Sequence, residues 1–342
     1  MTFQVSVVIP TFRRHELLNR CLAALVTQDL DPAAYEVIVA DDAASEDTRQ
    51  LVEEIAGSAS GGSFASLRMT LPAGANGPIL PTIRYVPVTG AHGPAAARNA
   101  GWRAAHSEII AFIDDDCIPT INWLKAGVNA FADGVVGVSG KIVIPPVLHP
   151  TDYELNATQL AKVDFVTANC FYRREALEEV GGFDERFKMA WREDSDLVFS
   201  LRERNARLIN APEVVVMHPI RSAPWGISLS QQRKSMFNAL LYKKHPTLYR
   251  KYIQASPPWD YYCIIGAFLL ALAGLLVGLP LVALLAFGTW FFLTGLFSMR
   301  RLRHTSHAPA HVAEMIVTSM LIPPLAIFWC LVGAFKFRVF FL

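Results

Sequence analysis

The sequence predicts an α/β fold with a mixed, mainly parallel sheet, followed by C-terminal transmembrane helices. In the first part of the chain, apolar β-branched runs at residues 5–10 and 35–40 each lead through a polar loop into a segment with helical spacing. Repeats of strand and helix at this spacing form parallel sheets with right-handed crossovers. In the last part, residues 261–299 contain no charged side chain, and a run of this length is typical of membrane-spanning helices.

The overall composition narrows the class of protein. The chain has 342 residues and a net charge of +1, so it has room for more than one domain and no positive field that would favour nucleic acid. Hydrophobic residues make up 52%, and the excess lies towards the C-terminus. The 5 cysteines are scattered, which favours a reducing compartment over a disulfide framework. The first residues lack the pattern of a signal peptide, so we expect a cytoplasmic N-terminal domain.

The first two strand–helix units place polar residues at strand ends. Residues 5–10 predict a buried strand, and residues 16–28 have the apolar spacing of a helix. Residues 35–40 predict a second buried strand, which ends near Asp42 and is followed by a helix to about residue 55. Because the carboxyl ends of parallel strands share one edge of a sheet, we expect a ligand site at this edge.

A third strand and a helix rich in small residues follow. Residues 57–82 are rich in Gly, Ala, Ser and Pro without apolar periodicity, and we interpret them as a flexible excursion. Residues 84–88 predict a short strand. Residues 93–101 then open a helix in which Arg98 supplies a cation. The alternative explanation for these small residues is close packing of the helix on the sheet.

Three consecutive acids form the centre of the pattern. The apolar run at residues 109–113 leads directly into Asp114, Asp115 and Asp116. An unpaired carboxylate is strongly penalised in an apolar interior, so these acids must be solvated at the sheet edge or compensated by a cation. Hard divalent ions prefer oxygen ligands, which makes a metal and diphosphate site one interpretation. The alternative is a polar loop that simply ends the strand.

A second group of polar residues lies further along the chain. The elements expected here are helices at residues 123–132 and 175–180 and strands at residues 135–144 and 214–217. Residues 191–197 begin another helix, with Glu193 and Asp194 in its first turn. Acids at this position also complement the helix dipole and cap free N–H groups, which is the structural alternative. His218 follows the last strand, where a lone histidine is usually structural.

The order and spacing of these segments resemble the inverting family-2 glycosyltransferases, which have the GT-A fold. The resemblance covers residues 5–220, and it lies in the series rather than in any one motif. The segments that carry it are VSVVIPTFRR, EVIVADDAASEDT, GPAAARNAG, AFIDDD, GGFDERF, WREDSDL and the late histidine.

The resemblance implies a nucleotide-diphosphate sugar as donor, Mg²⁺ or Mn²⁺ as cofactor, and a set of site residues. Asp116 and His218 match the metal ligands, and Asp194 matches the catalytic base. Glu193 is an alternative base or a residue that orients the acceptor, and the sequence does not separate the two acids. The residues implied to bind the donor are Pro10, Thr11, Asp42, Arg98, Asp114 and Asp115. Of these, Asp42 matches the acid that reads the base, and Arg98 is expected near the diphosphate.

One departure from the family pattern bears on the type of reaction. Members that polymerise sugars processively resemble one another in a Gln-x-x-Arg-Trp motif after the base. The corresponding residues 229–235 contain Arg233, which we place among the donor-binding residues, but no tryptophan. This difference favours transfer of a single sugar over processive synthesis.

The C-terminal region has the composition of a membrane domain. Residues 229–241 outline a helix with one apolar face, which suits either the membrane interface or packing against the N-terminal domain. Residues 261–299 suit two short crossings with a turn at residues 278–280. The arginines at residues 300–303 then mark the cytoplasmic side. Residues 312–335 form a third hydrophobic segment, which either crosses the membrane or dips in and returns.

We therefore expect a GT-A domain at residues 1–225, an amphipathic linker at 226–258 and a membrane domain at 259–342. The expected enzyme lies at the inner (cytoplasmic) membrane, with its catalytic domain facing the cytoplasm. Its expected partners are membrane lipid and a lipid-linked or membrane-proximal acceptor, and no nucleic acid. The alternatives are a processive polysaccharide synthase and a catalytically silent sugar-nucleotide-binding membrane protein. A nucleotidyltransferase would share the strand-end acids but would not account for the GGFDERF and WREDSDL segments.

Overall fold

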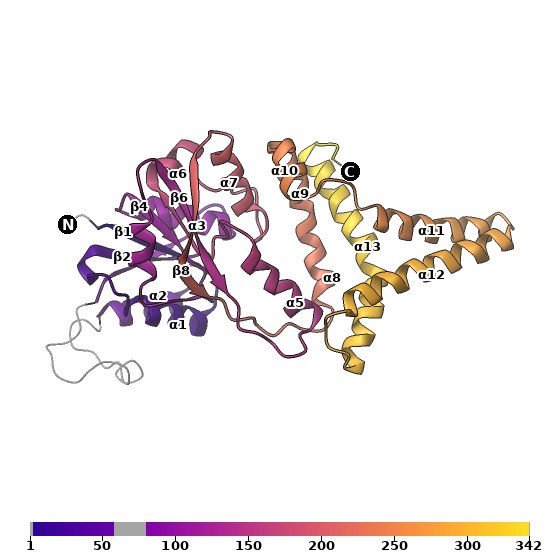
Figure 1. The fold of residues 1–342 in the computed structure, drawn as a ribbon, viewed down its shortest axis with the longest axis horizontal. Helices are drawn as coiled ribbons and strands as arrows, with labels where there is room; N and C mark the ends of the chain where they lie inside the picture. Colours follow the sequence, from indigo (N-terminus) through magenta and orange to yellow (C-terminus); the bar gives the residue numbers. More distant parts are fainter. Residues whose placement is uncertain (1–2, 58–79, 342) are drawn as a thin grey trace. The chain divides into compact units, whose positions relative to one another are not determined.

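The computed structural model describes residues 3–57 and 80–341, and the chain forms two compact units (Figure 1). The N-terminal unit consists of Met1–Pro145 and Leu160–Pro219, and the C-terminal unit consists of Pro146–Gln159 and Ile220–Leu342. Most of the excursion expected at residues 57–82 lies outside the described residues.

The N-terminal unit is built around a sheet with strand order β3-β2-β1-β4-β7-β6-β8-β5. The first four strands in this order are parallel, β7 runs antiparallel to β4 and β6, and β8 runs parallel to β6. The predicted mixed, mainly parallel sheet is therefore confirmed. The strands are β1 (Val5–Thr11), β2 (Tyr35–Asp41), β3 (Thr82–Pro87), β4 (Ile109–Phe112), β5 (Ile118–Pro119), β6 (Val135–Val143), β7 (Cys170–Arg173) and β8 (Arg207–Met217).

Helices cover both faces of the sheet because alternate residues of its central strands point to opposite sides. Val7 and Val37 pack in one apolar cluster with α1, α2 and α4, whereas Val8 and Ile38 pack in another with α3, α6 and α7. The helices of this unit are α1 (His15–Leu25), α2 (Glu46–Gly57), α3 (Pro94–Ala104), α4 (Trp123–Asn129), α6 (Arg174–Val180) and α7 (Glu193–Arg202), with the 3-10 helix η1 (Pro32–Ala34). A second 3-10 helix, η4 (Gln159–Lys162), lies where the chain passes between the units.

The small residues of α3 have a packing role. A Cβ at Gly101 would overlap the side chain of Val8, so only glycine lets α3 lie this close to β1. Other details differ from the sequence prediction: the helix expected at 16–28 ends at Leu25, and the strand expected at 214–217 begins at Arg207. Strands β5 and β7 were not predicted. They are two and four residues long, so their pairing partners rather than a sequence period define them.

The C-terminal unit is helical throughout most of its length. The hairpin expected at 261–299 is formed by α11 and α12, which join at Gly278 in the left-handed conformation (φ 76°). The third hydrophobic segment is one continuous helix that contains Pro323 and Pro324. By length and composition, α11, α12 and α13 are each sufficient to cross a membrane. The helices are α5 (Asp152–Thr158), α8 (Ile227–Gln231), the 3-10 helix η5 (Gln232–Ser235), α9 (Met236–Lys244), α10 (Pro246–Tyr252), α11 (Trp259–Leu276), α12 (Pro280–Leu302) and α13 (Pro309–Phe337).

Residues 146–159 differ from the expected domain division, which placed them in the first 225 residues. They belong to the C-terminal unit, whose second part begins at Ile220. A capping box of Thr151 and Glu154 starts α5, and the carboxylate of Asp152 pairs with Arg301 of α12 at 2.7 Å. The sequence does not show this because the two charged partners are separated by 149 positions.

The packing of α13 on α9 gives a first prediction. A Cβ at Gly333 would overlap the backbone carbonyl of Met236, which cannot move independently of α9. We expect Gly333→Ala to lower the free energy of unfolding by about 1–3 kcal/mol, seen as a lower thermal unfolding midpoint in detergent. Gly295→Ala in α12 is the matched control, since in the described part of the chain no atom outside its own stretch of helix lies within 4 Å of its added Cβ. Equal midpoints for the two variants would contradict this packing.

Candidate active site

The three acids after β4 occupy different environments. Asp114, Asp115 and Asp116 form the turn between β4 and β5, and the backbone N–H of Cys117 closes it by donating to Asp114 O at 3.1 Å. Asp115 and Asp116 are 2% and 7% exposed, whereas the side chain of Asp114 is 28% exposed. Of the three, Asp114 is therefore the most accessible to a ligand.

Asp115 is held by the loop that follows β1. Thr11 Oγ1 donates to one carboxylate oxygen at 2.8 Å, and Arg14 Nη1 donates to the other at 3.0 Å. Burial raises the pKa of Asp115 to about 6, against the opposing effect of Arg14. Arg14 also lies 3.9 Å from Asp116. From the sequence, Arg14 was assigned only to the loop after the first strand. Its position beyond a strand that ends at the same sheet edge as the three acids could have indicated a charge partner for them.

Arg98 joins the acids of β4 to the start of α7. Its Nη2 donates to Asp114 at 2.8 Å and its Nη1 donates to Glu193 at 3.0 Å, and its side chain is 3% exposed. Burial acts to lower the pKa of this guanidinium, but Asp114 and Glu193 raise it above its ordinary value, so the group stays charged. The expected contact of Arg98 with a diphosphate remains a prediction, whereas its role between these two acids is visible directly.

Glu193 and Asp194 are adjacent in the first turn of α7 but differ in access. Glu193 is 3% exposed, and burial raises the pKa of its carboxyl group to about 7 against the opposing charge of Arg98. Asp194 is half-buried and accepts from the backbone N–H of Ser195 at 2.6 Å. Arg192 is the N-cap residue of α7, and its side chain makes no capping hydrogen bond. Capping of the helix therefore does not account for both acids.

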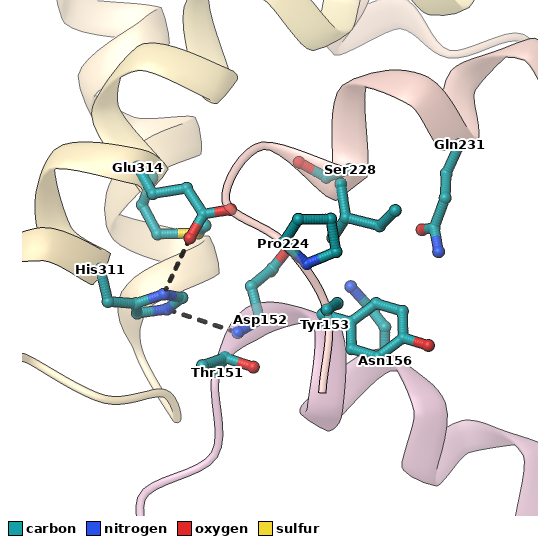
Figure 2. A pocket seen from close by; sticks show the side chains of 12 residues that line it. Thr151, Asp152, Tyr153, Asn156, Pro224, Ser228, Gln231, His311 and Glu314 are labelled. Atoms are coloured by element: carbon teal, nitrogen blue, oxygen red, sulfur yellow. Dashed lines mark hydrogen bonds and ion pairs between the residues drawn. The ribbon is translucent and has the colours of Figure 1, made fainter. Parts of the chain in front are cut away.

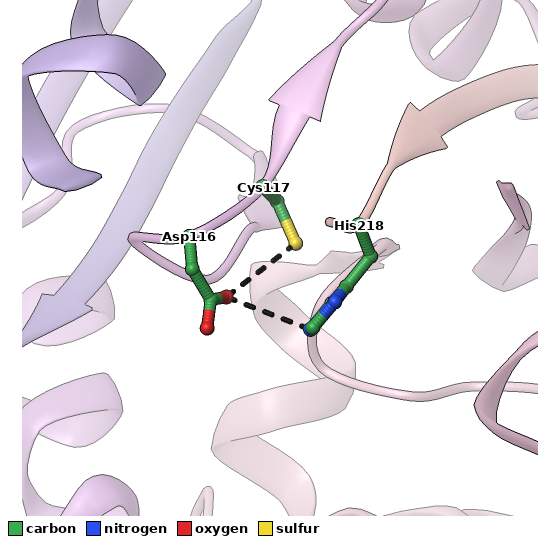
Figure 3. A group of neighbouring side chains, drawn as sticks. All are labelled: Asp116, Cys117 and His218. Atoms are coloured by element: carbon green, nitrogen blue, oxygen red, sulfur yellow. Dashed lines mark hydrogen bonds and ion pairs between the residues drawn. The ribbon is translucent and has the colours of Figure 1, made fainter. Parts of the chain in front are cut away.

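Asp116 and His218 come together from strands that are distant in sequence (Figure 3). His218 follows β8, where its backbone N–H donates to Val143 O at 2.9 Å, and its Nε2 lies 3.5 Å from Asp116 Oδ1. Two atoms that bind one ion at about 2.1 Å each are at most about 4.2 Å apart, so this pair fits a shared divalent ion. Cys117 Sγ lies 3.9 Å from Asp116. Burial raises the pKa of that thiol well above its ordinary value, and hard ions prefer oxygen ligands, so Cys117 is a poorer ligand for such an ion than Asp116.

The remaining expected donor residues lie at two places. Asp42 follows β2, and both its carboxylate oxygens accept from the backbone N–H of Gly93 at 3.0 Å, which fixes the start of α3. Pro10 pairs with Ala40 in the sheet next to it. Arg233 belongs to the C-terminal unit instead, where its guanidinium lies 5.7 Å from the ring centroid of Trp329.

Comparisons with known proteins agree on one class of enzyme. The family model described as Glycosyl transferase family 2 matches residues 6–181, and that described as Glycosyl transferase family group 2 matches residues 109–337. Glycosyltransferase AglE from Haloferax volcanii is 25% identical over 243 residues, which cover 67% of this chain and 70% of that protein. The pre-mycofactocin glycosyltransferase from Mycobacterium tuberculosis is 32% identical over 146 residues, 38% of this chain and 31% of that protein.

A solved structure shares the fold. The mannosyltransferase PcManGT from Pyrobaculum calidifontis, in complex with GDP-Man and Mn2+, aligns with a TM-score of 0.53 and 19% identity, and the alignment covers 97% of this chain and 88% of that chain.

The raised pKa of Glu193 predicts a specific pH dependence of stability. Between its ordinary value of 4.5 and about 7, the folded protein keeps a proton that the unfolded chain has lost. Stability must therefore fall as pH rises through this window, by up to about 1.4 kcal/mol per pH unit for one group. Asp115, with its pKa raised to about 6, adds to the fall in the lower part of this window. We expect Glu193→Gln to make the fall in the thermal unfolding midpoint shallower, above all between pH 6 and 7, measured without added metal. The exposed Glu179→Gln should keep the wild-type slope, and a Glu193→Gln curve parallel to wild type would contradict the assignment.

Proposed function

Because the chain belongs to glycosyl transferase family 2, we propose that it is a metal-dependent, inverting enzyme that transfers a single sugar from a nucleotide-diphosphate sugar to a lipid-linked or membrane-proximal acceptor. Its family and relatives make it a glycosyltransferase, and its structural neighbour supports the GT-A fold. The dependence on a metal, the inversion of configuration and the nature of the acceptor are argued below from the residues of this chain.

One observation carries the proposal: the buried Arg98 joins Asp114 at the end of β4 to Glu193 at the start of α7. The two ion pairs hold the strand-end acids and the first turn of α7 together. A donor sugar bound beside Asp114 and an acceptor hydroxyl approaching α7 would then meet at a fixed separation. Fixing the two reactants in line is a large part of how such displacements are accelerated.

The donor side of the site follows from the acids and their partners. Asp116 and His218 would hold a divalent ion, with Arg14 beside them. When bound, such an ion supplies a Lewis acid that stabilises charge on the departing diphosphate. Asp115 is engaged by Thr11 and Arg14, so we give it the role of positioning that loop under the donor. We place the nucleoside at the edge formed by the ends of β1 and β2, next to Pro10 and Asp42.

The acceptor side favours Asp194 as the base. A general base must come within hydrogen-bond reach of the acceptor hydroxyl. Asp194 is half-buried, whereas Glu193 is buried and paired with Arg98. The Asp194 carboxylate would take the proton of the hydroxyl as its oxygen attacks the anomeric carbon opposite the diphosphate. A single displacement of this kind inverts the configuration at that carbon.

The apolar helices support an acceptor that is confined to a membrane. A protein held at the bilayer meets such an acceptor in two dimensions, and the helices of the C-terminal unit provide the attachment. Arg300, Arg301 and Arg303 favour placing the end of α12 on the cytoplasmic side, with the N-terminal unit.

A processive synthase is the second candidate. The family's processive members have a tryptophan next to the arginine that corresponds to Arg233, and here Trp329 of α13 lies over that arginine instead. Product size separates the two functions: a single-sugar enzyme gives one product of fixed mass increment at any donor excess, and a synthase gives a ladder. A catalytically silent protein would bind donor without producing either.

The donor is found with a panel of nucleotide sugars. A donor at about 100 times its dissociation constant stabilises the folded protein by about 2.7 kcal/mol, which is visible as a higher unfolding midpoint. We expect one nucleotide sugar to stabilise the protein only with Mn²⁺ or Mg²⁺ present, and the same compound to support transfer.

The metal site gives a prediction with a readout besides activity. We expect Asp116→Asn to weaken Mn²⁺ binding by at least about 10-fold and to abolish measurable transfer, because the carboxylate charge is lost at the ion. Mn²⁺ titration of the purified protein measures the first effect. Asp29→Asn, an exposed acid paired with Lys125, is the matched control and should bind Mn²⁺ like wild type. Transfer that survives both Asp116→Asn and EDTA would rule out a metal-dependent reaction.

The base is tested by comparing two conservative variants. Asp194→Asn keeps the size of the side chain but cannot take a proton, so we expect kcat to fall by about 10²–10⁴-fold with donor and Mn²⁺ affinity unchanged. The measurement is transfer rate at saturating donor. If Asp194→Asn retains near-native rate while Glu193→Gln is inactive, Glu193 is the base. If both variants remain active, neither acid is the base.

A further inference from the structure

The length of α13 does not by itself decide how it lies in a membrane. Its 29 residues extend about 44 Å, enough to cross a hydrocarbon core of roughly 30 Å. An alternative is that the helix lies along the membrane surface. The polar contacts along α13 distinguish the two, because charged groups are excluded from the hydrocarbon core.

The first turns of α13 lie in a buried polar cluster (Figure 2). His311 Nε2 accepts from the backbone N–H of Asp152 at 3.3 Å, and the His311 ring lies 3.6 Å from the carboxylate of Glu314. That carboxylate also accepts from the backbone N–H of Gly226 at 2.6 Å. This end of the helix is therefore held by polar groups from α5 and from the segment before α8.

An ion pair touches α13 one third of the way along. Arg301 of α12 pairs with Asp152 at 2.7 Å and donates to Thr318 Oγ1 at 2.7 Å and to Ser319 Oγ at 3.1 Å. The Arg301 side chain is 10% exposed, so its charge is satisfied inside the C-terminal unit rather than by solvent.

Charged groups contact the second half of α13 as well. The exposed Arg233 lies over the ring of Trp329, at 5.7 Å, and Lys243 Nζ donates to Phe337 O at 2.8 Å. Among the contacts that the described residues make with α13, the longest interval without a charged partner is therefore from Ser319 to Trp329. Ten residues of helix span about 15 Å, half of the roughly 30 Å that a crossing requires. A crossing α13 would place either Arg301 and Asp152 or Arg233 in hydrocarbon.

The helices that pack along α13 also favour a position at the membrane interface. Helices α8, η5 and α9 pack along it, and they carry Gln231, Gln232, Arg233 and Lys234 within four consecutive positions. If α13 crossed the membrane, this polar stretch would have to cross beside it. Its other face is apolar and uncovered, with Leu321, Phe328, Leu331 and Phe335 between 44% and 89% exposed. The buried face of α13 is polar at His311, Thr318 and Ser319 and apolar from Ile322 to Gly333. A helix docked on neighbours that carry charged residues, with a bare apolar face on its other side, suits a membrane interface.

The α11–α12 hairpin has the opposite character. Residues 261–299 carry no charge, and Figure 1 shows the hairpin projecting away from α13. Its tip is apolar, with Leu276, Val277 and Leu279 exposed by 87%, 73% and 52%. The 18 residues of α11 extend about 27 Å and the 23 residues of α12 about 35 Å, so the hairpin has about the depth of a hydrocarbon core of roughly 30 Å, and the composition of its turn decides whether the tip reaches water. A turn that reached water on the far side would be expected to carry polar residues.

We propose that the protein enters the membrane from one side only, with the α11–α12 hairpin inserted in the bilayer and α13 lying in the interface with α8 and α9. The bilayer covers the hairpin and the bare apolar face of α13. The C-terminal end, the loop after α12 and the N-terminal unit then share one side. Lys336 and Arg338 lie beside the exposed Phe335 at the end of α13, where cationic side chains reach the headgroups.

Cysteine labelling in sealed membrane vesicles of both orientations tests this arrangement. The background is the full chain with Cys263→Ser and Cys330→Ala, since the other cysteines are buried. Single cysteines replace Lys336 at the end of α13, His304 after α12, Leu276 at the hairpin tip and, as the reference for the N-terminal unit, the exposed Glu179. A membrane-impermeant maleimide is applied before and after detergent.

We expect Lys336→Cys and His304→Cys to label from the same side as Glu179→Cys, and Leu276→Cys to label only after detergent. Labelling of Lys336→Cys from the opposite side, or from neither side, would overturn the interfacial placement of α13. Labelling of Leu276→Cys from either side without detergent would overturn the inserted hairpin tip. Leu279→Cys provides a second tip position if Leu276→Cys is not retained in the membrane. The outcome does not depend on the sugar transferred or on whether transfer occurs.

Discussion

Charge compensation at the end of β4 is the constraint on which the N-terminal unit depends. Three carboxylates follow a strand whose residues are all buried, and a buried carboxylate without a partner destabilises a fold by several kcal/mol. Arginines from two other elements meet this requirement: Arg98 of α3 pairs with Asp114, and Arg14 after β1 pairs with Asp115. Arg98 also pairs with Glu193, and Arg14 also approaches Asp116. The contacts that stabilise the fold therefore fix the distances between the groups that we propose to react.

The burial of Arg98 explains features that lie outside the site. Arg98 comes between Asp114 and Glu193 while α3 packs closely on β1, and Gly101 permits that approach because any Cβ would overlap Val8. Burial also distinguishes Glu193 from Asp194 and agrees with the different roles that we propose for them. Glu193 is enclosed with its cation and has a raised pKa, which suits a positioning residue, whereas Asp194 next to it stays half-exposed.

The elements that could be predicted from the sequence are those with a recognisable local pattern of residues. Runs rich in β-branched residues identify β1 and β2, and the three acids after β4 are consecutive in the sequence. Contacts between distant residues were not predictable in this way. Thr11 and Asp115 are separated by 104 positions, and Asp152 and Arg301 by 149, so neither pair leaves a local pattern. The role of Arg14 and the placement of residues 146–159 were missed for this reason. The pairing of Asp116 with His218 was expected only from the family resemblance, and the structure brings the two side chains to 3.5 Å.

The same rule of charge compensation acts in the C-terminal unit, where it separates two kinds of apolar helix. Hydropathy alone does not distinguish α13 from α11 and α12, since all three are long and apolar enough to cross a membrane. The positions of the charged partners do distinguish them: Arg301, Arg233 and Lys243 contact α13 at intervals along its length, whereas residues 261–299 of the hairpin contain none. A helix whose partners are charged cannot leave the interface without them. Insertion of the hairpin alone moves no charged side chain across the bilayer, and it would leave the polar helices at the depth of the lipid headgroups, where the acceptor that we propose would present its hydroxyl.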